Sequence, residues 1–598
     1  MSDQTVIIPG NKGHKRNKSN LISLIKSLQD LTPSSPSRKA LKKANANASL
    51  NKRTSLTELQ TDSTQTPTLN SNSKDTGLRP SAARPPRRKP FNTCLAKKDL
   101  DSLRYLIGNC VGSVREIKVN IQKNETTLEP LRKYDLQSEI NKIFEKIQKH
   151  IPNVTFTYFN RSTSVNNSKV SIVNESEQYC VGEDLVVQVD MYDHLGNRKT
   201  HGGDFIRSRL FSKKLGAAVS GSVKDFLNGS YHIHFPLQWA DDKTKVSIRL
   251  WHPSEGIAAL WRSRHASQGV LGYQGKYVYL DKEAISTCGF LLNTTEEVCE
   301  YKDELYEEAF YCIRPKNLPC ECLNNMRAVN IEMSYLTPEE RKLFERSNVG
   351  VEMAQSLNPV VVTPCKNHSA ASNVKCQPGM SSPFPSGYFY NYTWRPVYCD
   401  MTVYKSGDDF LKCLQGKNLF LIGDSTLRQY MTHLTEGIKI VKYFSYEGGW
   451  SSWEKTLEAF NMDNDIYVSY KRHGFPLESF SFFYSKEDMY TSRQIDQRGG
   501  GKDTIIVITM GQHFRQFPLK LYIRRAINIR RAVERLFLRS PDTKVIIKTE
   551  NTREGKFPTP QEKLGDFHGY CQYLVLREVF QGINVGFVDA WDMTIDPN

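Results

Sequence analysis

The stretch that decides the fold of the C-terminal region is 417–431, "KNLFLIGDSTLRQYM". Its apolar run, 418–422, has the length of a buried strand, and "TLRQYM" continues as a helix. Gly423, Asp424 and Ser425 form a sharp turn between the two. A serine at such a turn lies at the carboxyl edge of a sheet and can act as a nucleophile. The alternative is a helix N-cap, in which Asp424 or Ser425 only satisfies the first turn.

Strands and helices alternate through the rest of the region 377–598. "DTIIVITMG", "TKVIIKTEN" and "NVGFVDAWDM" are predicted strands, and "RRAINIRRAVERLFLRS" and "GYCQYLVLREVFQ" are predicted helices. This pattern predicts a three-layer α/β domain whose parallel sheet is covered on both faces. Sites in such sheets form at the carboxyl ends of the strands. The residues expected to line a site there are Gly511, His513 and Asn551. Asp589 and Asp592 could line it as well, but the favoured interpretation is that they are loop-capping carboxylates.

The region 94–287 is predicted to hold a helical segment followed by a β domain. "LRKYDLQSEINKIFEKIQKHI" places apolar residues at helical spacing. Five later segments alternate apolar and polar residues, and turn signals such as "DHLGN" and "LNGS" separate them. These predicted strands are 154–162, 168–173, 184–193, 229–237 and 244–252. Short strands at this spacing predict an antiparallel Ig-like β-sandwich.

Thirteen cysteines occur in the chain, and six of them fall within 288–365. Zinc sites use paired C-x-x-C units, whereas the one tight pair here is Cys320-Glu-Cys322. The pattern therefore favours disulfides over metal, and 288–376 is predicted to be a disulfide-stapled connector. An odd total leaves at least one thiol free or available to another chain, with Cys94 and Cys571 as candidates.

N-x-S/T sequons cluster in the same part of the chain as the cysteines. Their density beside predicted disulfides indicates a glycosylated protein of the secretory pathway. The candidate glycosylation sites are Asn124, Asn153, Asn160, Asn166, Asn174, Asn228, Asn293, Asn367 and Asn391.

The net charge of +17 is concentrated near the N-terminus, where 1–93 holds 17 Lys/Arg against 5 Asp/Glu. This segment is poor in aromatic residues and is predicted to be a disordered basic tail. We predict no nucleic-acid partner, because no basic helix with interleaved aromatic residues occurs. We also expect no transmembrane segment, since no apolar run reaches 18 residues, and "LISLIKSL" is too short for a signal-peptide core.

"LIGDSTLRQYM", "MGQHF", "KTEN" and "NVGFVDAWDMT" resemble the PC-esterase domain, a branch of the GDSL/SGNH hydrolases. Together with the β domain and the Cys-rich connector, the chain from about residue 94 resembles the NXPE family of neurexophilin and PC-esterase domain proteins. The resemblance implies Ser425 as the nucleophile and Gly511 as the third-block glycine. His513 stands where the superfamily usually has an asparagine oxyanion donor, and Gly448 is a candidate second-block donor.

The family also implies an Asp and a His after the last strand, as a D-x-x-H-like element. The sequence instead reads "DAWDMTIDPN" to Asn598, with Asp589 and Asp592 but no histidine. Of the histidines elsewhere in the chain, His513 at a strand end is then the first candidate base, followed by His473 and His568, which lie in polar, loop-like contexts. A serine without a positioned base is a poor nucleophile, so we expect an incomplete triad with weak or absent activity, that is, a pseudoenzyme.

The resemblance implies two alternative functions. The first is a glycan O-acetyltransferase or acetylesterase, with a sialic acid or another sugar hydroxyl as acceptor. It would need an acetyl donor, for which acetyl-CoA is one candidate, and no bound cofactor or metal is expected. The second is a non-enzymatic, neurexophilin-like secreted protein that binds a neurexin-like receptor.

Overall fold

The predicted strand at 418–422 is observed as β18 (Asn418–Gly423), which lies inside a seven-stranded sheet of the computed structural model. The structure describes residues 135–266, 269–330, 334–365, 374–444, 456–485, 488–553 and 561–595. The strands of this sheet are, in spatial order, β19 (Lys442–Tyr443), β20 (Leu457–Asn461), β21 (Ile466–Arg472), β18, β23 (Thr504–Ile508), β24 (Lys544–Lys548) and β25 (Gly586–Val588).

The order of these strands reverses at β18. β21, which follows β18 in the parallel part of the sheet, pairs with it on one side, and β23 pairs with it on the other. β24 and β25 then extend the parallel sheet beyond β23. On the other side, β20 pairs antiparallel with β21, and β19 pairs antiparallel with β20. In open parallel sheets, ligands bind outside the carboxyl ends of the strands at such a reversal. Ser425 follows β18, so it lies at that point.

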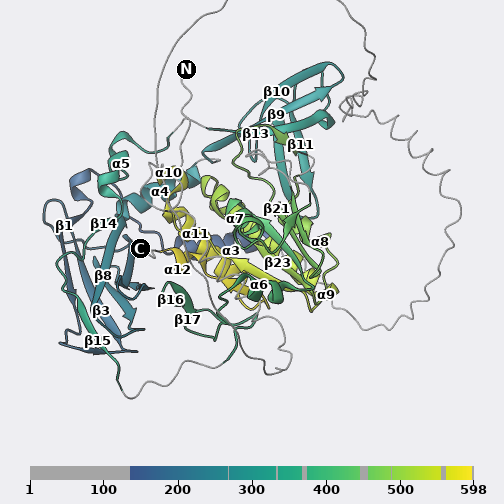
Figure 1. Cartoon of the computed structure of the whole chain (residues 1–598). Coiled ribbons are helices and arrows are strands. Elements are labelled where there is room, and N and C mark those ends of the chain that lie inside the picture. Colours follow the sequence, from purple (N-terminus) through teal and green to yellow (C-terminus); the bar gives the residue numbers. More distant parts are fainter. Residues whose placement is uncertain are drawn as a thin grey trace, which may run out of the picture. The chain divides into compact units, whose positions relative to one another are not determined.

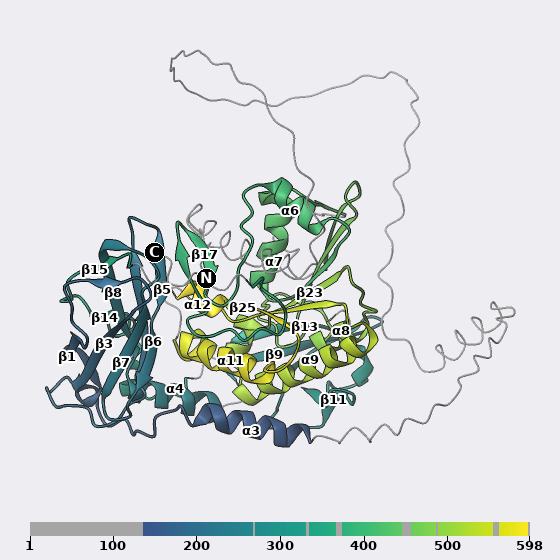
Figure 2. The ribbon, with the colours of Figure 1, turned by 90° about the horizontal axis from the view of Figure 1, so that it is seen from below.

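Helices cover both faces of this sheet, as Figure 2 shows with α9 and α11 on one side and α6 and α7 on the other. Alternate residues of the central strands enter two separate apolar cores: Ile506 faces the first and Val507 the second. The helices of the two layers are α9 (Leu519–Arg539) and α11 (Asp566–Val579), then α6 (Gly407–Leu414) and α7 (Ser425–Thr432). The predicted parallel sheet with two covered faces is therefore observed.

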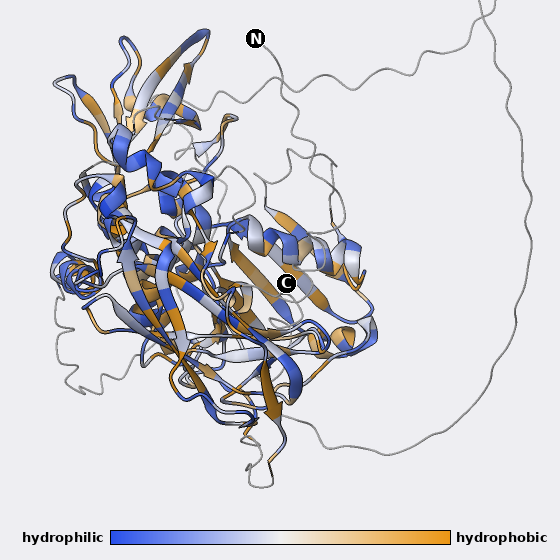
Figure 3. Ribbon diagram, turned by 90° about the vertical axis from the view of Figure 1, so that its left-hand side faces the viewer, coloured by the Kyte–Doolittle hydropathy of each residue, from blue (hydrophilic) through white to orange (hydrophobic). Residues whose placement is uncertain are grey.

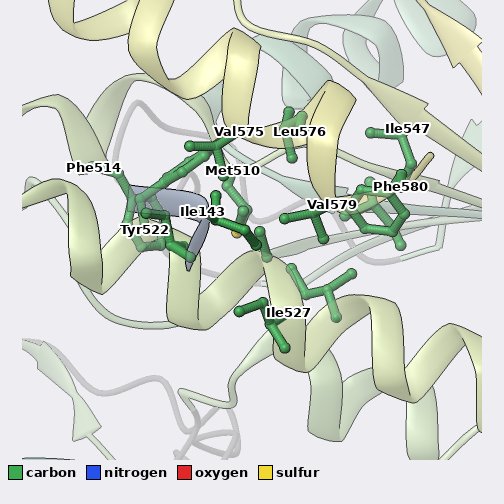
Figure 4. Packing of buried hydrophobic residues seen from close by; sticks show 14 of the residues in the cluster. Ile143, Met510, Phe514, Tyr522, Ile527, Ile547, Val575, Leu576, Val579 and Phe580 are labelled. Carbon is green, nitrogen blue, oxygen red and sulfur yellow. The ribbon is translucent and has the colours of Figure 1, made fainter. Parts of the chain in front are cut away.

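Helix α3 (Leu136–Gln148) is the predicted amphipathic helix of the N-terminal part of the β domain, but it packs elsewhere. Leu136, Ile140, Ile143 and Ile147 are buried in the same core as α9 and α11. Figure 4 shows Ile143 among residues of these helices, close to Met510, Phe514 and Tyr522. The helix therefore belongs to the α/β domain. Hydrophilic and hydrophobic residues alternate along the helices and strands of the molecule, as the hydropathy colouring in Figure 3 shows.

The β domain consists of two sheets whose inner faces share one apolar core (Figure 1). Leu185, Val187 and Val189 of one sheet pack in this core with Ile248 and Leu250 of the other. The first sheet contains β1 (Thr163–Ile172), β3 (Asp184–Asp193), β7 (Ser230–Pro236) and β6 (Ser222–Asp225). The second contains β17 (Thr393–Pro396), β16 (Gly387–Tyr390), β5 (Ala217–Ser220), β4 (Phe205–Ser212), β8 (Asp241–His252), β15 (Val360–Thr363), β2 (Tyr179–Cys180) and β14 (Val351–Glu352).

One predicted strand of this domain, 154–162, was wrong. That segment runs without strand pairing into a short 3-10 turn, η1 (Phe159–Arg161), whose backbone bonds close locally from Arg161 N to Tyr158 O and from Ser162 N to Phe159 O. Its alternation of polar and apolar residues has no partner strand, so the β pattern alone does not produce a strand there.

A third sheet joins residues from three of the predicted regions. Its strands are β11 (Val298–Asp303), β12 (Glu308–Ile313), β10 (Lys282–Gly289), β9 (Leu271–Tyr279), β13 (Leu323–Asn330) and β22 (Phe483–Tyr484). β22 comes from the α/β region, between β21 and α8 (Thr491–Asp496). Conversely, two strands of the second sheet of the β domain come from later regions: β15 from the predicted connector and β16 from the predicted α/β region. The sheets therefore do not follow the predicted limits at 287 and 376.

Disulfides occur throughout the Cys-rich part, as predicted. The four pairs with both partners described are Cys180–Cys365, Cys288–Cys312, Cys299–Cys320 and Cys376–Cys399. Cys322 is also disulfide-bonded. Cys571, a predicted free thiol, is a buried thiol whose pKa burial raises to about 12. Cys94 lies outside the described residues.

Three helices connect these parts or cap their edges: α4 (Ser254–Ala266), α10 (Gln561–Leu564) and α12 (Ala590–Thr594). The short helix α5 (Pro338–Lys342) begins with a capping box formed by Thr337 and Glu340. Within the residues described, none of the helices is both long and apolar enough to cross a membrane.

Candidate active site

The turn after β18 separates the roles of its two polar residues. Asp424 is the N-cap of α7 and is buried, and its Oδ1 accepts from Thr426 N at 2.8 Å and from Thr426 Oγ1 at 2.6 Å. Ser425 is the first residue of α7 and is exposed. The capping interpretation therefore holds for Asp424, which leaves Ser425 available for another role at the positive end of the helix dipole.

Gly511 brings the second predicted block against the first. Its φ is +48°, and a Cβ there would lie 2.0 Å from Asp424 Oδ2. The next backbone N–H, that of Gln512, donates to the same oxygen at 3.2 Å. Only a glycine allows this approach, because any side chain would displace the Asp424 carboxylate. The structure therefore unites Gly423, Asp424 and Gly511 beside Ser425.

His513 lies in the 3-10 turn η7 (Gly511–Gln516) and forms a pair with a second histidine. Its Nδ1 is 3.0 Å from Nε2 of His473, which follows directly after β21 and is 2% exposed. Burial and the neighbouring His513 lower the pKa of His473 to about 3, so this ring is neutral at physiological pH. Burial also lowers the pKa of His513, while the Asp424 charge acts in the opposite direction.

Two charged side chains at the end of β24 complete the environment of Asp424. Lys548 and Glu550 are 1% and 2% exposed, and Gln512 Nε2 donates to Glu550 Oε1 at 2.9 Å. Burial alone would raise the pKa of Asp424, but Lys548, His513 and the Thr426 bonds outweigh it, so the pKa is lowered. Asp424 is therefore a buried, ionised carboxylate at neutral pH, stabilised by a buried lysine.

The sequence analysis did not identify Lys548 or Gln512 as site residues, and it placed His473 in a polar loop, behind His513 as a candidate base. Lys548 lies near the end of the predicted strand "TKVIIKTEN" and resembles an ordinary polar residue there. One available signal was position: His473 and Lys548 both come directly at the carboxyl end of a strand of the parallel sheet, like the residues that were predicted.

The remaining predicted site residues lie farther along the same edge. The Asn551 carbonyl accepts from Arg515 at 2.6 Å, and its side chain contacts Lys548. β25, which precedes Asp589 and Asp592, is three strands from β18, about 14 Å at ordinary strand spacing. Gly448 lies outside the described residues.

Asp589 and Asp592 make contacts that hold the structure together. Asp589 caps α12 and accepts from Tyr573 OH at 3.1 Å, and Asp592 Oδ2 accepts from Ser386 N at 2.6 Å and Ser386 Oγ at 2.8 Å. Burial and the Asp589 charge raise the pKa of Asp592 to about 7. A small cavity beside Asp589 is lined by Trp394, Tyr398 and Phe587, among others.

The predicted glycosylation sites that the structure describes are all exposed. They are Asn153, Asn160, Asn166, Asn174, Asn228, Asn293 and Asn391. Asn124 and Asn367 lie outside the described residues. Within the described residues, no group of three or more His, Cys, Asp or Glu has an arrangement that could hold a metal ion.

Fold and site define a class: a disulfide-bonded β domain joined to a parallel α/β domain with an exposed serine at its switch point. Residues 394–598 match the family model described as NXPE family member 4-like, C-terminal domain, and residues 150–330 match the model described as Neurexophilin. Together the two matches cover about two thirds of the chain. The chain belongs to the NXPE family, and the PC-esterase resemblance of its C-terminal region is consistent with that membership.

Proposed function

We propose that the C-terminal domain is a serine acyl-transfer domain of the secretory pathway, a glycan O-acetyltransferase or acetylesterase, with Ser425 as nucleophile. The observation that carries the proposal is the place of Ser425. Its exposed hydroxyl starts α7 directly after β18, at the point where the strand order reverses. Hydrogen bonds from Thr426 and from the backbone N–H of Gln512 to Asp424 support the turn that carries Ser425.

The proposed chemistry begins with attack of Ser425 Oγ on an acetyl carbonyl carbon. The serine proton goes to a base, and the tetrahedral oxyanion accepts hydrogen bonds from backbone N–H groups at the start of α7. Collapse of this intermediate forms the acetyl-serine ester and releases the donor's leaving group, which takes a proton. A sugar hydroxyl, or water, then attacks the ester and regenerates Ser425.

The base in this scheme is assigned to His513, which interacts electrostatically with Asp424, the residue before Ser425. Its Nδ1 is already paired with His473, so only Nε2 is available for proton transfer. Within the described residues, no hydrogen bond joins Ser425 Oγ to a histidine. We therefore expect weak activity, because an unpositioned base contributes little to the rate.

A carbohydrate acceptor and a secretory location fit the rest of the chain. Exposed sequons and several disulfides, four of them with both cysteines among the described residues, are typical of proteins that fold in an oxidising compartment. The donor is an acetyl compound such as acetyl-CoA, and the acceptor is a sialic acid or another sugar hydroxyl.

A second candidate function is a secreted binding protein without enzymatic activity. It is favoured by the match of residues 150–330 to Neurexophilin and by the engagement of His513 with His473. In that case the β domain binds a neurexin-like receptor, and the α/β domain serves as a scaffold.

The experiment that tests the proposal compares wild type with Ser425→Ala, with Ser481→Ala as the matched control. Acetyl release from an O-acetylated sialoglycan, and acetyl transfer from acetyl-CoA to the de-acetylated glycan, are measured for each protein. We expect both low activities to be lost only in Ser425→Ala. Equal turnover by wild type and Ser425→Ala would refute the nucleophile and favour the binding function.

A further inference from the structure

A buried arginine of the β domain reaches into the α/β domain. Arg207 lies in β4, and its guanidinium is 4.1 Å from the centre of the Trp251 ring in the adjacent strand β8. Its Nη1 is 2.6 Å from Asp566 Oδ2, and its Nη2 donates to the Ile595 carbonyl at 2.7 Å. The side chain of Arg207 is only 9% exposed, so this ion pair is shielded from solvent.

Asp566 shares its carboxylate between two arginines, one from each domain. It is the first residue of α11, and its second oxygen, Oδ1, accepts from Arg515 Nη1 at 3.0 Å and from Arg553 N at 2.8 Å. The side chains of Arg515 and Asp566 are 0% and 1% exposed. Each arginine therefore neutralises part of a carboxylate that water does not reach.

Arg515 continues the connection toward the site. Its Nη2 lies 3.3 Å from Glu550 Oε1, the same oxygen that accepts from Gln512 Nε2. The backbone N–H of Gln512 in turn holds Asp424 Oδ2. Side chains and one peptide group thus form an unbroken chain of contacts from β4 to the N-cap that precedes Ser425.

Positive and negative side chains alternate in this series of contacts: Arg207, Asp566, Arg515 and Glu550. Removal of the charge at Arg207 is therefore expected to shift the ion pairs that follow it. If Arg207 were neutral, Asp566 Oδ2 would lose its charged partner, and Arg515 alone would have to balance the buried carboxylate. Asp566 would then draw Arg515 closer, at the expense of Glu550. The bond from Glu550 to Gln512, and with it the position of the Gln512 N–H against Asp424, would loosen.

We infer that Arg207 is a positioning residue for the Ser425 site, so that the β domain is a structural part of that site. The inference rests on the proposed function for its catalytic consequence, but the coupling itself is testable without any activity. It predicts that a change confined to β4 alters the turn Gly511–Gln516 and the start of α7.

The test uses the full chain with Arg207→Gln and Arg207→Lys, and Arg249→Gln as the matched control. Arg249 is the β8 residue paired with Arg207 across the sheet, but its partner, Glu352, lies within the β domain. Hydrogen exchange is measured for peptides covering 510–517 and 424–430. We expect about tenfold faster exchange in Arg207→Gln, a smaller increase in Arg207→Lys and no change in Arg249→Gln.

Unchanged exchange in both peptides of a folded Arg207→Gln would overturn the inference. If Arg207→Gln does not fold, Arg207→Lys decides, since one ammonium cannot replace the two guanidinium nitrogens that bind Asp566 Oδ2 and the Ile595 carbonyl, and the contact with Asp566 is therefore weakened. Exchange equal to wild type in Arg207→Lys would then overturn it. The catalytic consequence is tested by the rate at which a fluorophosphonate probe labels Ser425. We expect the fastest labelling in wild type, slower labelling in Arg207→Lys and the slowest in Arg207→Gln. No labelling of wild type, together with altered exchange in the variants, would refute the proposed function and leave the coupling intact.

Discussion

Two pairs of polar residues follow strands of the same parallel sheet, and the structure uses them in opposite ways. Asp424 and Ser425 follow β18, and Asp589 and Asp592 follow β25. Both aspartates that directly follow a strand cap a helix, α7 or α12. The first carboxylate faces a buried lysine and has a lowered pKa, whereas burial raises the pKa of both carboxyls in the second pair.

The difference shows that a place at the carboxyl edge of a sheet does not by itself define a site. The role of each carboxylate depends on the side chains and backbone groups that surround it. Lys548 and Gln512 keep Asp424 ionised and fixed, and the serine beside it stays exposed. Asp592, by contrast, is bound by Ser386, and its neighbouring carboxyl disfavours a second charge.

The largest effect is expected for Gly511→Ala, which forces a methyl group against the Asp424 carboxylate. Overpacking and a positive φ together predict a loss of about 4 kcal/mol in the free energy of unfolding. Thermal unfolding checks this. Gly499→Ala is the control, because a Cβ there has no atom within 4 Å. Equal stability of the two variants would contradict the described approach of the two blocks.

Asp424→Asn keeps the shape of the cap but removes the charge that faces Lys548. The buried ammonium of Lys548 then keeps only Glu550 as a nearby carboxylate, which predicts a loss of about 3 kcal/mol at pH 7. Because the folded pKa of Asp424 is lowered, its contribution is present above the unfolded pKa and is lost as the pH falls through the folded pKa. Denaturant unfolding at pH 7 and at lower pH should therefore show a difference from wild type that shrinks with acid.

Asp592→Asn tests the other carboxylate pair and should have the opposite pH dependence. The folded pKa of about 7 lies above the ordinary value of 3.8, so this group lowers stability as the pH rises from about 4 to 7. Asparagine mimics the protonated acid, so the variant should gain about 2 kcal/mol relative to wild type between pH 5 and pH 8. A parallel pH profile for the two proteins would show that Asp592 is ionised.

Tyr573→Phe is the mildest change, since it removes only the hydrogen bond that the hydroxyl donates to Asp589 and the longer one that it accepts from Arg577. We expect a loss of about 1 kcal/mol in stability and no change in the labelling of Ser425. Tyr392→Phe, at a residue that is 68% exposed, is the control for stability. A reduced labelling rate in Tyr573→Phe would show that the edge at β25 takes part in the site.

The sequence predicts the local elements of this fold well, because periodicity and turn residues act over short distances. The parallel sheet, α3 and most strands of the β domain follow from such patterns. The partners of these elements depend on contacts between distant residues. The packing of α3 against α9 and the pairing of β22 with β13 could not be derived from spacing.

The candidate site was predictable to a similar extent. The turn at Gly423, Asp424 and Ser425 and the glycine at 511 were identified, and the structure brings them together. Lys548 was missed and His473 was placed behind His513, because nothing local distinguishes a buried polar side chain at a strand end from an exposed one. Their burial follows only from the layers that cover the sheet.

The most direct test of the central claim is to trap the acetylated protein. The full chain is incubated with an activated acetyl ester, the reaction is quenched in acid, and modified peptides are mapped by mass spectrometry. The account predicts a slowly formed acetyl ester on Ser425 that is absent from Ser425→Ala and retained in Ser481→Ala. Acetylation spread over other residues, with none on Ser425, would contradict it.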